Sequence, residues 1–285
     1  MALLEVSNVR RRFGGLVALD RVSFQVTAGQ IKGIIGPNGA GKTTLFNLIS
    51  GLLKPETGEM VFKGRRLNGL KPYQVAQTGL SRTFQNPSLF LKMNVLENVM
   101  VGRHYRTRWE FIGCALRWPG QPREEAAIRA AALEQLDYVG LGRLAAFPAG
   151  ALAFGQRRMV ELARALATEP EMLLLDEPAS GLNTKEREGL GELIRKIRDR
   201  GVTVLLVEHD MSMVMGLSDD ILVLHNGTPI AEGPPAMVQN DPKVISIYLG
   251  EQFVGAAEPP AMPAGLIEPG LAAAAGPQPH GRGAG

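Results

Sequence analysis

The sequence predicts an α/β fold whose central sheet is parallel. Three short apolar runs carry this prediction, at residues 31–35, 172–175 and 202–207. Continuous apolar runs of this length are typical of parallel strands that are covered on both faces. A glycine-rich or acidic segment follows each run, and ligands of open α/β sheets bind at the carboxyl ends of the strands. We therefore expect the functional site at these three strand ends.

The loop after the first run fits G-x-x-x-x-G-K-[ST], which predicts a phosphate-binding loop. Its glycines let several backbone N–H groups point at a phosphate, and a helix expected over residues 42–52 adds its partial positive charge. Lys42 is expected to reach the β- and γ-phosphates, and the Thr43 hydroxyl to ligate Mg²⁺. A glycine-rich turn before a helix is the alternative. The expected nucleotide-contacting residues of this loop are Gly36, Pro37, Asn38, Gly39, Ala40, Gly41, Lys42, Thr43 and Thr44.

Carboxylates follow the second run, and an imidazole follows the third. Asp176 is expected to hold Mg²⁺, and Glu177 to accept a proton from an attacking water. The third run ends in Glu208-His209-Asp210. Taken alone, the pattern favours a packed or solvated histidine for His209. Its strand should lie near that of the phosphate loop, which favours a role in the site.

Periodicity places the remaining elements. Residues 3–9, 22–26 and 59–63 are expected to form a separate β layer, and residues 94–101 and 123–139 are expected to be helices.

The clearest helix follows Asn183, a candidate N-cap with Glu186 three residues on. Gly201 stands where this helix should stop, and the strand at 202–207 then returns to the sheet, as a β-α-β unit requires. One apolar face is formed by Leu190, Leu193, Ile194 and Ile197.

Composition supports a globular class without naming a function. The chain has 285 residues, of which 45% are apolar, and its net charge of +3 is too small to indicate nucleic-acid binding. The single cysteine, Cys114, cannot form an internal disulfide, which agrees with a reducing compartment. Neither a signal peptide nor an apolar run approaching about 18 residues is found, so a pore would have to be another polypeptide.

The segment Leu152-Ala-Phe-Gly-Gln156, before a helix expected over residues 157–168, completes an ordered series of motifs. With it the chain resembles the nucleotide-binding subunits of ABC transporters, over roughly residues 3–250. In chain order the motifs are Phe13, the loop 36–44, Gln85 within Arg82-Thr-Phe-Gln-Asn86, the signature 152–156, Asp176 with Glu177, the loop Ser180-Gly-Leu-Asn183, and His209.

The resemblance implies a P-loop NTPase fold with a RecA-like core, an antiparallel β subdomain and an inserted helical subdomain. Residues 1–85 and 156–250 would form the ATP-binding core with the β subdomain. Residues 86–155 would form the helical subdomain, with the signature at its end.

The resemblance also implies roles for single residues, with ATP and Mg²⁺ as cofactors. Phe13 would stack on adenine, and Gly155 and Gln156 would contact the ATP bound by a second subunit. The implied catalytic residues are Glu177, His209 and Gln85, and the implied Mg²⁺ ligands are Thr43, Gln85 and Asp176.

Two departures from the family pattern stand out. Ala153 and Phe154 replace the usual serine and glycine of the signature, which removes a hydroxyl that could bond the γ-phosphate. Asn183 stands where the family often has aspartate. Because neither change touches Lys42 or Glu177, ATP hydrolysis is still expected.

The details are similar to the larger ATPase subunit of branched-chain amino-acid importers, notably the aromatic signature, the ending Tyr248-Leu-Gly-Glu251 and the insert between residues 101 and 124. This implies transmembrane permease subunits and a second ABC ATPase subunit, in a homo- or heterodimer, as partners. A periplasmic or extracellular substrate-binding protein would act through the permease. The implied location is peripheral, on the cytoplasmic face of the inner or plasma membrane.

Other functions remain as alternatives. Urea or amide import and lipopolysaccharide export are related systems, although the export ATPase lacks the insert. A soluble ABC ATPase that acts on DNA or the ribosome usually has tandem cassettes or coiled coils, which this chain lacks. An unrelated GTPase would need Asn-Lys-x-Asp, which is absent.

Two segments receive no catalytic role. Residues 103–123 are expected to be a solvated surface loop, with contact to lipid headgroups or a membrane partner as the alternative. Residues 251–285 are dominated by Ala, Gly and Pro and are expected to be a disordered tail, because they cannot bury enough apolar surface to offset their ordering entropy.

Overall fold

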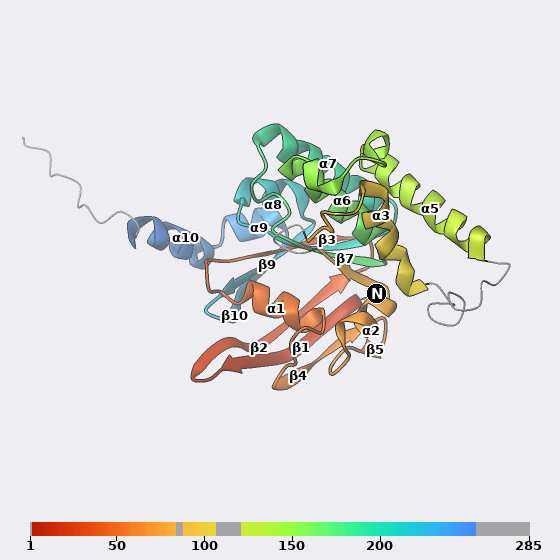
Figure 1. Ribbon diagram of the computed structural model, residues 1–285. Helices are drawn as coiled ribbons and strands as arrows, with labels where there is room; N and C mark the ends of the chain where they lie inside the picture. Colours follow the sequence, from red (N-terminus) through yellow and green to blue (C-terminus); the bar gives the residue numbers. More distant parts are fainter. Residues whose placement is uncertain (1, 84–87, 107–120, 255–285) are drawn as a thin grey trace, which may run out of the picture.

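The computed structural model describes residues 2–83, 88–106 and 121–254, and it contains two sheets with a helix between them (Figure 1). Gln85, the middle of the insert and the end of the tail lie outside these residues.

The larger sheet has the strand order β10-β9-β3-β8-β7-β6. Its strands are parallel except for β10, which pairs antiparallel with β9. Every residue of β3, β7 and β8 is buried, so the predicted parallel sheet is confirmed. The strands are β3 (Ile31–Ile35), β6 (Leu80–Arg82), β7 (Met172–Asp176), β8 (Thr203–Val207), β9 (Asp220–His225) and β10 (Thr228–Gly233).

The smaller sheet is antiparallel and contains the predicted β layer, in the order β2-β1-β4-β5. The first two strands are longer than expected and form one hairpin, which turns at Gly14 and Gly15. The strands are β1 (Ala2–Phe13), β2 (Leu16–Thr27), β4 (Thr57–Phe62) and β5 (Arg65–Arg66).

Helix α1 (Lys42–Ile49) lies between the two sheets. Its Leu45 and Phe46 are buried in one apolar cluster with Leu4 of β1 and Leu174 of β7. The helix ends before the predicted residue 52. Gly51 follows with φ +76°, the left-handed conformation that commonly ends a helix. The helix that follows the phosphate loop is therefore held in place by packing against both sheets.

Two helices, α6 (Phe154–Leu166) and α7 (Thr184–Asp199), cover the other face of the parallel sheet. The predicted cap of α7 is confirmed. Asn183 Oδ1 accepts the Glu186 N–H at 3.0 Å, and Glu186 Oε2 accepts the Asn183 N–H at 3.0 Å. The predicted apolar face of α7 is buried as well.

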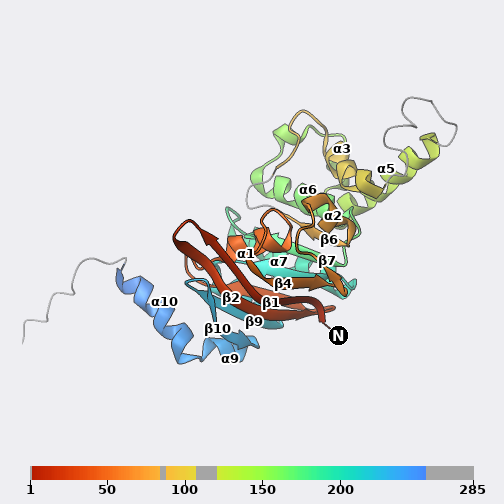
Figure 2. The ribbon, with the colours of Figure 1, turned by 90° about the horizontal axis from the view of Figure 1, so that it is seen from below.

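A separate helical group projects from the sheets (Figure 2). Its apolar cluster joins α3 (Val95–Met100) and α5 (Gln121–Tyr138) to α6. Short 3₁₀ helices lie between these elements, namely η1 (Val101–Arg106), η2 (Gly142–Leu144) and η3 (Ala149–Ala151). Both helices predicted in this region are present, with shifted ends.

The remaining helices lie at the sheet edges. α2 (Pro72–Gln77) precedes β6, and α8 (Met211–Leu217), α9 (Pro235–Gln239) and α10 (Pro242–Val254) flank β9 and β10. α10 extends past residue 251, where the tail was expected to begin, so the first four residues of the expected tail are helical. Within the described ranges, no helix is long and apolar enough to cross a membrane.

Candidate functional site

A cleft of about 480 Å³ lies at the carboxyl ends of the parallel strands, a volume typical of small-molecule sites. It brings together residues that lie far apart in the sequence and includes most of the predicted phosphate loop. The lining residues are Phe13, Leu16, Val17, Ala18, Asn38, Gly39, Ala40, Gly41, Lys42, Thr43, Thr44, Glu177, His209 and Asn226.

Two glycines give the phosphate loop its shape. Gly36 has φ +151° and Gly41 has φ +100°, conformations that L side chains rarely adopt. A Cβ on Gly36 would overlap the Leu224 carbonyl, and one on Gly41 would overlap the Ala18 carbonyl. Gly41 is also the N-cap of α1. The N-terminus of the helix therefore opens at the cleft, where its dipole favours an anion.

Lys42 places its charge inside this loop. Its side chain is 5% exposed, and Nζ donates to the Gly36 carbonyl at 2.5 Å and the Pro37 carbonyl at 2.9 Å. Gly36 and Pro37 themselves do not line the cleft. A buried ammonium beside a helix N-terminus is suited to bind phosphate oxygens.

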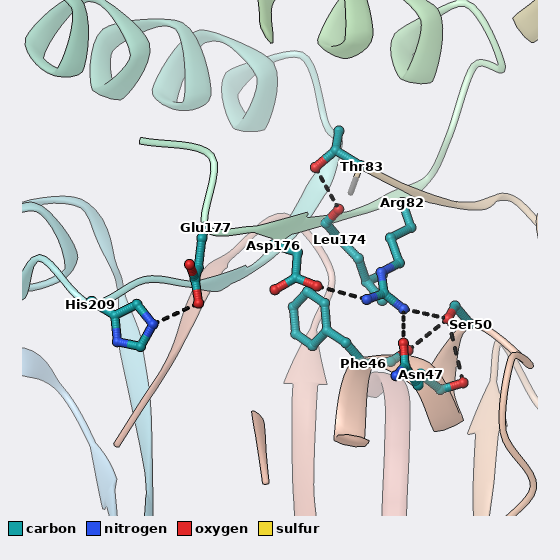
Figure 3. Close-up of polar contacts among 9 residues, drawn as sticks. All are labelled: Phe46, Asn47, Ser50, Arg82, Thr83, Leu174, Asp176, Glu177 and His209. Atoms are coloured by element: carbon teal, nitrogen blue, oxygen red, sulfur yellow. Dashed lines mark hydrogen bonds and ion pairs between the residues drawn. The ribbon is translucent and has the colours of Figure 1, made fainter. Parts of the chain in front are cut away.

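Glu177 and His209 form a pair at the same cleft (Figure 3). His209 Nε2 lies 2.6 Å from Glu177 Oε1. Glu177 has φ +46°, which is rare for a residue other than glycine, and its N–H donates to the Val207 carbonyl at 2.9 Å. Strained backbone of this kind is often found at functional sites. The strand ends of β7 and β8 thus hold an acid and an imidazole in contact.

Glu208, to which the sequence analysis gave no role, joins two loops beside the cleft. Its side chain, 4% exposed, accepts the Ala179 N–H at 2.6 Å and the His209 N–H at 3.2 Å. Burial raises the pKa of this carboxyl group. Glu208 therefore ties the loop after Glu177 to the loop that carries His209. The only sign of this residue in the sequence was its position directly before His209.

Asp176 is buried and does not line the cleft, although its neighbour Glu177 does. Its Oδ2 accepts from Arg82 Nη2 at 2.7 Å. Figure 3 shows the two neighbouring acids pointing in different directions, Asp176 to Arg82 and Glu177 to His209.

The predicted Mg²⁺ ligands are only partly brought together. Thr43 is exposed in the cleft, Asp176 ends β7, and Gln85 lies outside the described residues. Among the residues described, no group of three His, Cys, Asp or Glu side chains could hold a metal. Mg²⁺ on a nucleotide usually takes one or two protein oxygens and fills its shell with phosphate and water. A hydroxyl and a carboxylate therefore fit such an ion.

Phe13 lies at the rim of the cleft with 44% of its surface exposed. The Arg11 guanidinium lies 4.9 Å from the centre of its ring. An exposed ring at this position is available to stack on a planar group.

The signature segment does not line this cleft. Helix α6 begins at Phe154, earlier than the predicted residue 157, because Gln156 Oε1 accepts the Ala153 N–H at 3.0 Å and closes its first turn. A Cβ on Gly155 would meet Glu186 Oε1 at 2.6 Å, so this glycine lies close to the first turn of α7. Ala153 and Phe154 are exposed. The expected ligand-contacting residues Gly155 and Gln156 are therefore placed away from the phosphate loop of the same chain.

Four lining residues were not anticipated, namely Leu16, Val17, Ala18 and Asn226. Asn226 lies in the turn between β9 and β10. The next residue, Gly227, donates its N–H to the Ala40 carbonyl at 3.1 Å and accepts the Asp20 N–H at 2.9 Å. This turn packs on the phosphate loop through long-range contacts for which the sequence offers no local signal.

Comparisons with known proteins agree with this geometry. Residues 19–180 match the family described as ABC transporter, and residues 228–254 match the one described as branched-chain amino acid ATP-binding cassette transporter. The chain is 44% identical over 250 residues to the high-affinity branched-chain amino acid transport ATP-binding protein BraF of Pseudomonas aeruginosa, covering 87% of this chain and 98% of BraF.

Solved structures are similar over most of the chain. The ADP conformation of MJ1267, an ATP-binding cassette of an ABC transporter, matches with a TM-score of 0.77 and 34% identity, covering 88% of this chain and 99% of that one. The dimeric post-hydrolysis state of the ATP-binding cassette MJ0796, bound to ADP and Pi, matches with a TM-score of 0.69 and 28% identity, covering 81% and 98%. The predicted fold class is confirmed by these similarities.

Proposed function

Because this chain belongs to the ABC transporter family, we propose that it is the ATP-hydrolysing subunit of an importer for branched-chain amino acids. One observation carries the catalytic part of the proposal. The loop of Lys42, the carboxylate of Glu177 and the imidazole of His209 line the same cleft.

The loop binds the phosphates of ATP, and Phe13 stacks on the adenine. Lys42 supplies a full positive charge where the loop N–H groups and the α1 N-terminus supply partial ones. Thr43 and Asp176, with Gln85, would hold Mg²⁺, which would neutralise charge on the phosphate oxygens. The Thr43 hydroxyl, exposed in the cleft beside Lys42, supports this assignment.

Hydrolysis depends on Glu177 and His209, which follow the carboxyl ends of β7 and β8. Glu177 accepts a proton from the attacking water, and His209 positions that water against the γ-phosphate. An ionised Glu177 can only accept a hydrogen bond, so His209 Nε2 is the donor in their 2.6 Å contact. His209 therefore also fixes the orientation of the carboxylate.

The signature acts on a second nucleotide site. Gly155 and Gln156 are placed away from their own cleft, and the start of α6 is exposed. Two ATPase subunits related by a two-fold axis would place this helix end over the γ-phosphate held by the partner. The dimeric MJ0796 cassette supports such an arrangement. At this interface the exposed Phe154 would then occupy the position of the glycine that is usual in the family signature.

The proposal assigns one role to each part of the chain. Residues 1–85 and 156–250 hold the nucleotide, and residues 86–155 form the helical subdomain. The separate apolar cluster of α3, α5 and α6 supports treating this group as a unit that moves with the signature. Closure of two such subunits on ATP drives the conformational change of the transporter.

The transported class rests on similarity. The match of residues 228–254 favours branched-chain amino acids over urea, amides or exported lipopolysaccharide, and BraF supports the same assignment. Permease subunits form the pore, a second ABC ATPase completes the dimer, and a substrate-binding protein outside the membrane delivers the amino acid. The chain lies on the cytoplasmic face of the inner or plasma membrane and binds no nucleic acid.

Uptake in cells tests this proposal. A strain that lacks this chain should lose high-affinity uptake of radiolabelled leucine, and the wild-type chain should restore it. A Glu177→Gln chain should not restore uptake, whereas the exposed Glu192→Gln, on α7, should. Normal leucine uptake in the deletion strain, with loss of urea uptake, would overturn the assigned substrate class.

A further inference from the structure

Arg82, the last residue of β6, makes a buried ion pair with Asp176 at the end of the neighbouring strand β7. Arg82 Nη2 donates to Asp176 Oδ2 at 2.7 Å, and the two side chains are 7% and 4% exposed. A charge pair this deeply buried is costly to desolvate, and it is retained only where its geometry is well satisfied. The pair therefore calls for a specific role.

The other end of the guanidinium is anchored on helix α1. Arg82 Nη1 donates to Asn47 Oδ1 at 2.8 Å and to Ser50 Oγ at 2.9 Å (Figure 3). The Ser50 hydroxyl in turn donates to the Phe46 carbonyl at 2.8 Å. The Phe46 ring lies 5.6 Å from the guanidinium carbon, on the same helix. Three neighbouring groups therefore fix the plane of the Arg82 side chain.

Arg82 links helix α1 to strand β7, and each of these elements carries one residue assigned to the Mg²⁺ ion. Helix α1 begins at Lys42, directly after the phosphate loop, and carries Thr43 in its first turn. Asp176 lies across from it on β7. Arg82 bridges them with a rigid fork, a geometry that the single ammonium of lysine cannot reproduce. The guanidinium itself does not line the cleft, so it acts through Asp176.

We propose that Arg82 is a positioning residue that holds the Asp176 carboxylate, relative to helix α1, in the orientation required to bind Mg²⁺ with ATP. This inference rests on the proposed function. Outer-shell partners that orient a metal-binding carboxylate typically change metal affinity by about 10- to 100-fold when they are replaced.

Arg82→Lys separates positioning from simple charge, because lysine keeps the positive charge but lacks the planar fork. If Arg82 acted only through its charge, this substitution would leave the Mg²⁺ dependence unchanged. If Arg82 positions Asp176, the substitution breaks the link between Asp176 and the two anchors Asn47 and Ser50, and Mg²⁺ binding weakens. One titration therefore distinguishes the two roles.

The experiment measures binding of a fluorescent ATP analogue, MANT-ATP, to the purified full chain as a function of Mg²⁺ concentration, and in EDTA. For Arg82→Lys, we expect the half-saturating Mg²⁺ concentration to rise about tenfold. Binding of the metal-free nucleotide should stay within about twofold of wild type, because Arg82 does not line the cleft. Melting curves confirm that each variant is folded.

Two further variants complete the design. Asn47→Ala keeps Arg82 and Asp176 but removes one anchor, and should shift the Mg²⁺ dependence in the same direction by a smaller factor. Arg66→Lys is the control, because its pair with Glu59 is exposed, and it should match wild type. If Arg82→Lys fails to fold, Asn47→Ala still tests the proposal.

Either of two results overturns the inference. An unchanged Mg²⁺ dependence in both Arg82→Lys and Asn47→Ala would show that Asp176 needs no such support, and tighter Mg²⁺ binding in either variant would show that the fork does not hold Asp176 in the binding orientation. Failure of the wild-type chain to bind MANT-ATP at all would instead contradict the proposed function. The two failures are therefore distinguishable.

Discussion

The Nε2 atom of His209 lies 2.6 Å from Oε1 of Glu177, across the ends of two neighbouring parallel strands. The side chains assigned to accept the proton and to position the water are therefore one hydrogen-bonded unit. Glu208 supports this unit because its carboxylate accepts the N–H of Ala179 in one loop and the N–H of His209 in the other.

Replacing Lys42 with alanine should reduce ATP affinity by about 100-fold, because the phosphates lose charge-assisted hydrogen bonds worth about 1.5 to 3 kcal/mol each. Equilibrium binding of MANT-ATP measures this. Lys63→Ala is the matched control, since that lysine pairs with Glu171 on the surface. Near-normal affinity of Lys42→Ala would contradict the phosphate-loop assignment.

Glu177→Gln should bind ATP normally and hydrolyse it about 10²- to 10⁴-fold more slowly, because the amide cannot accept the proton. Phosphate release measures turnover. With ATP present, size-exclusion chromatography should show an accumulating dimer. A variant that turns ATP over at the wild-type rate would remove Glu177 from the mechanism.

His209→Ala should also slow hydrolysis with little change in ATP affinity. Since the two side chains act as a unit, the double variant with Glu177→Gln should be hardly slower than Glu177→Gln alone. Steady-state turnover of all four proteins gives the coupling. Strictly additive losses would mean that the 2.6 Å contact has no role in catalysis.

Glu208→Gln should make stability less sensitive to pH. Burial raises the pKa of Glu208, so the folded state prefers the protonated acid, and the associated stability is lost as pH rises through the raised pKa. Glutamine does not ionise and lacks this loss. The free energy of unfolding of the variant, relative to wild type, should therefore rise as the pH increases above about 4.5.

Urea unfolding across this pH range measures the difference between the two proteins. All other titrating groups are shared and cancel in the comparison. A difference that stays constant with pH, or that falls, would contradict the raised pKa of Glu208.

Lys32→Met should destabilise the core sheet by about 2 kcal/mol. Lys32 is 1% exposed on β3 and pairs with Asp220 on β9 and Glu232 on β10. Urea unfolding measures the change. Lys63→Met removes an exposed pair and should cost less than about 1 kcal/mol. Equal effects of the two substitutions would show that the buried pairs of Lys32 contribute no more to stability than the exposed pair of Lys63.

The site could be predicted where its residues are contiguous in the sequence. The loop 36–44, the acids after β7 and His209 after β8 each follow a continuous apolar run, and strand ends of one parallel sheet meet by geometry. The Asn183 cap was predicted for a similar reason, since both partners lie within one helical turn.

The remaining features depend on contacts between distant segments. Arg82 and Asp176 are 94 positions apart, and Lys32 and Asp220 are 188 apart. No local pattern specifies such pairs. β6 was missed because its three residues are too few to show a period. The start of α6 was placed too late because Phe154 and Gly155 are poor helix formers, and the Gln156 side chain overrides that preference.

The central claim is that this ATPase powers a membrane transporter. Its most direct test is to purify the chain with its partners from native membranes and identify them by mass spectrometry. We expect two multi-span permeases together with a second, smaller ABC ATPase. Recovery of ribosomal or DNA-repair proteins without any permease would contradict the transport claim while leaving the ATPase chemistry intact.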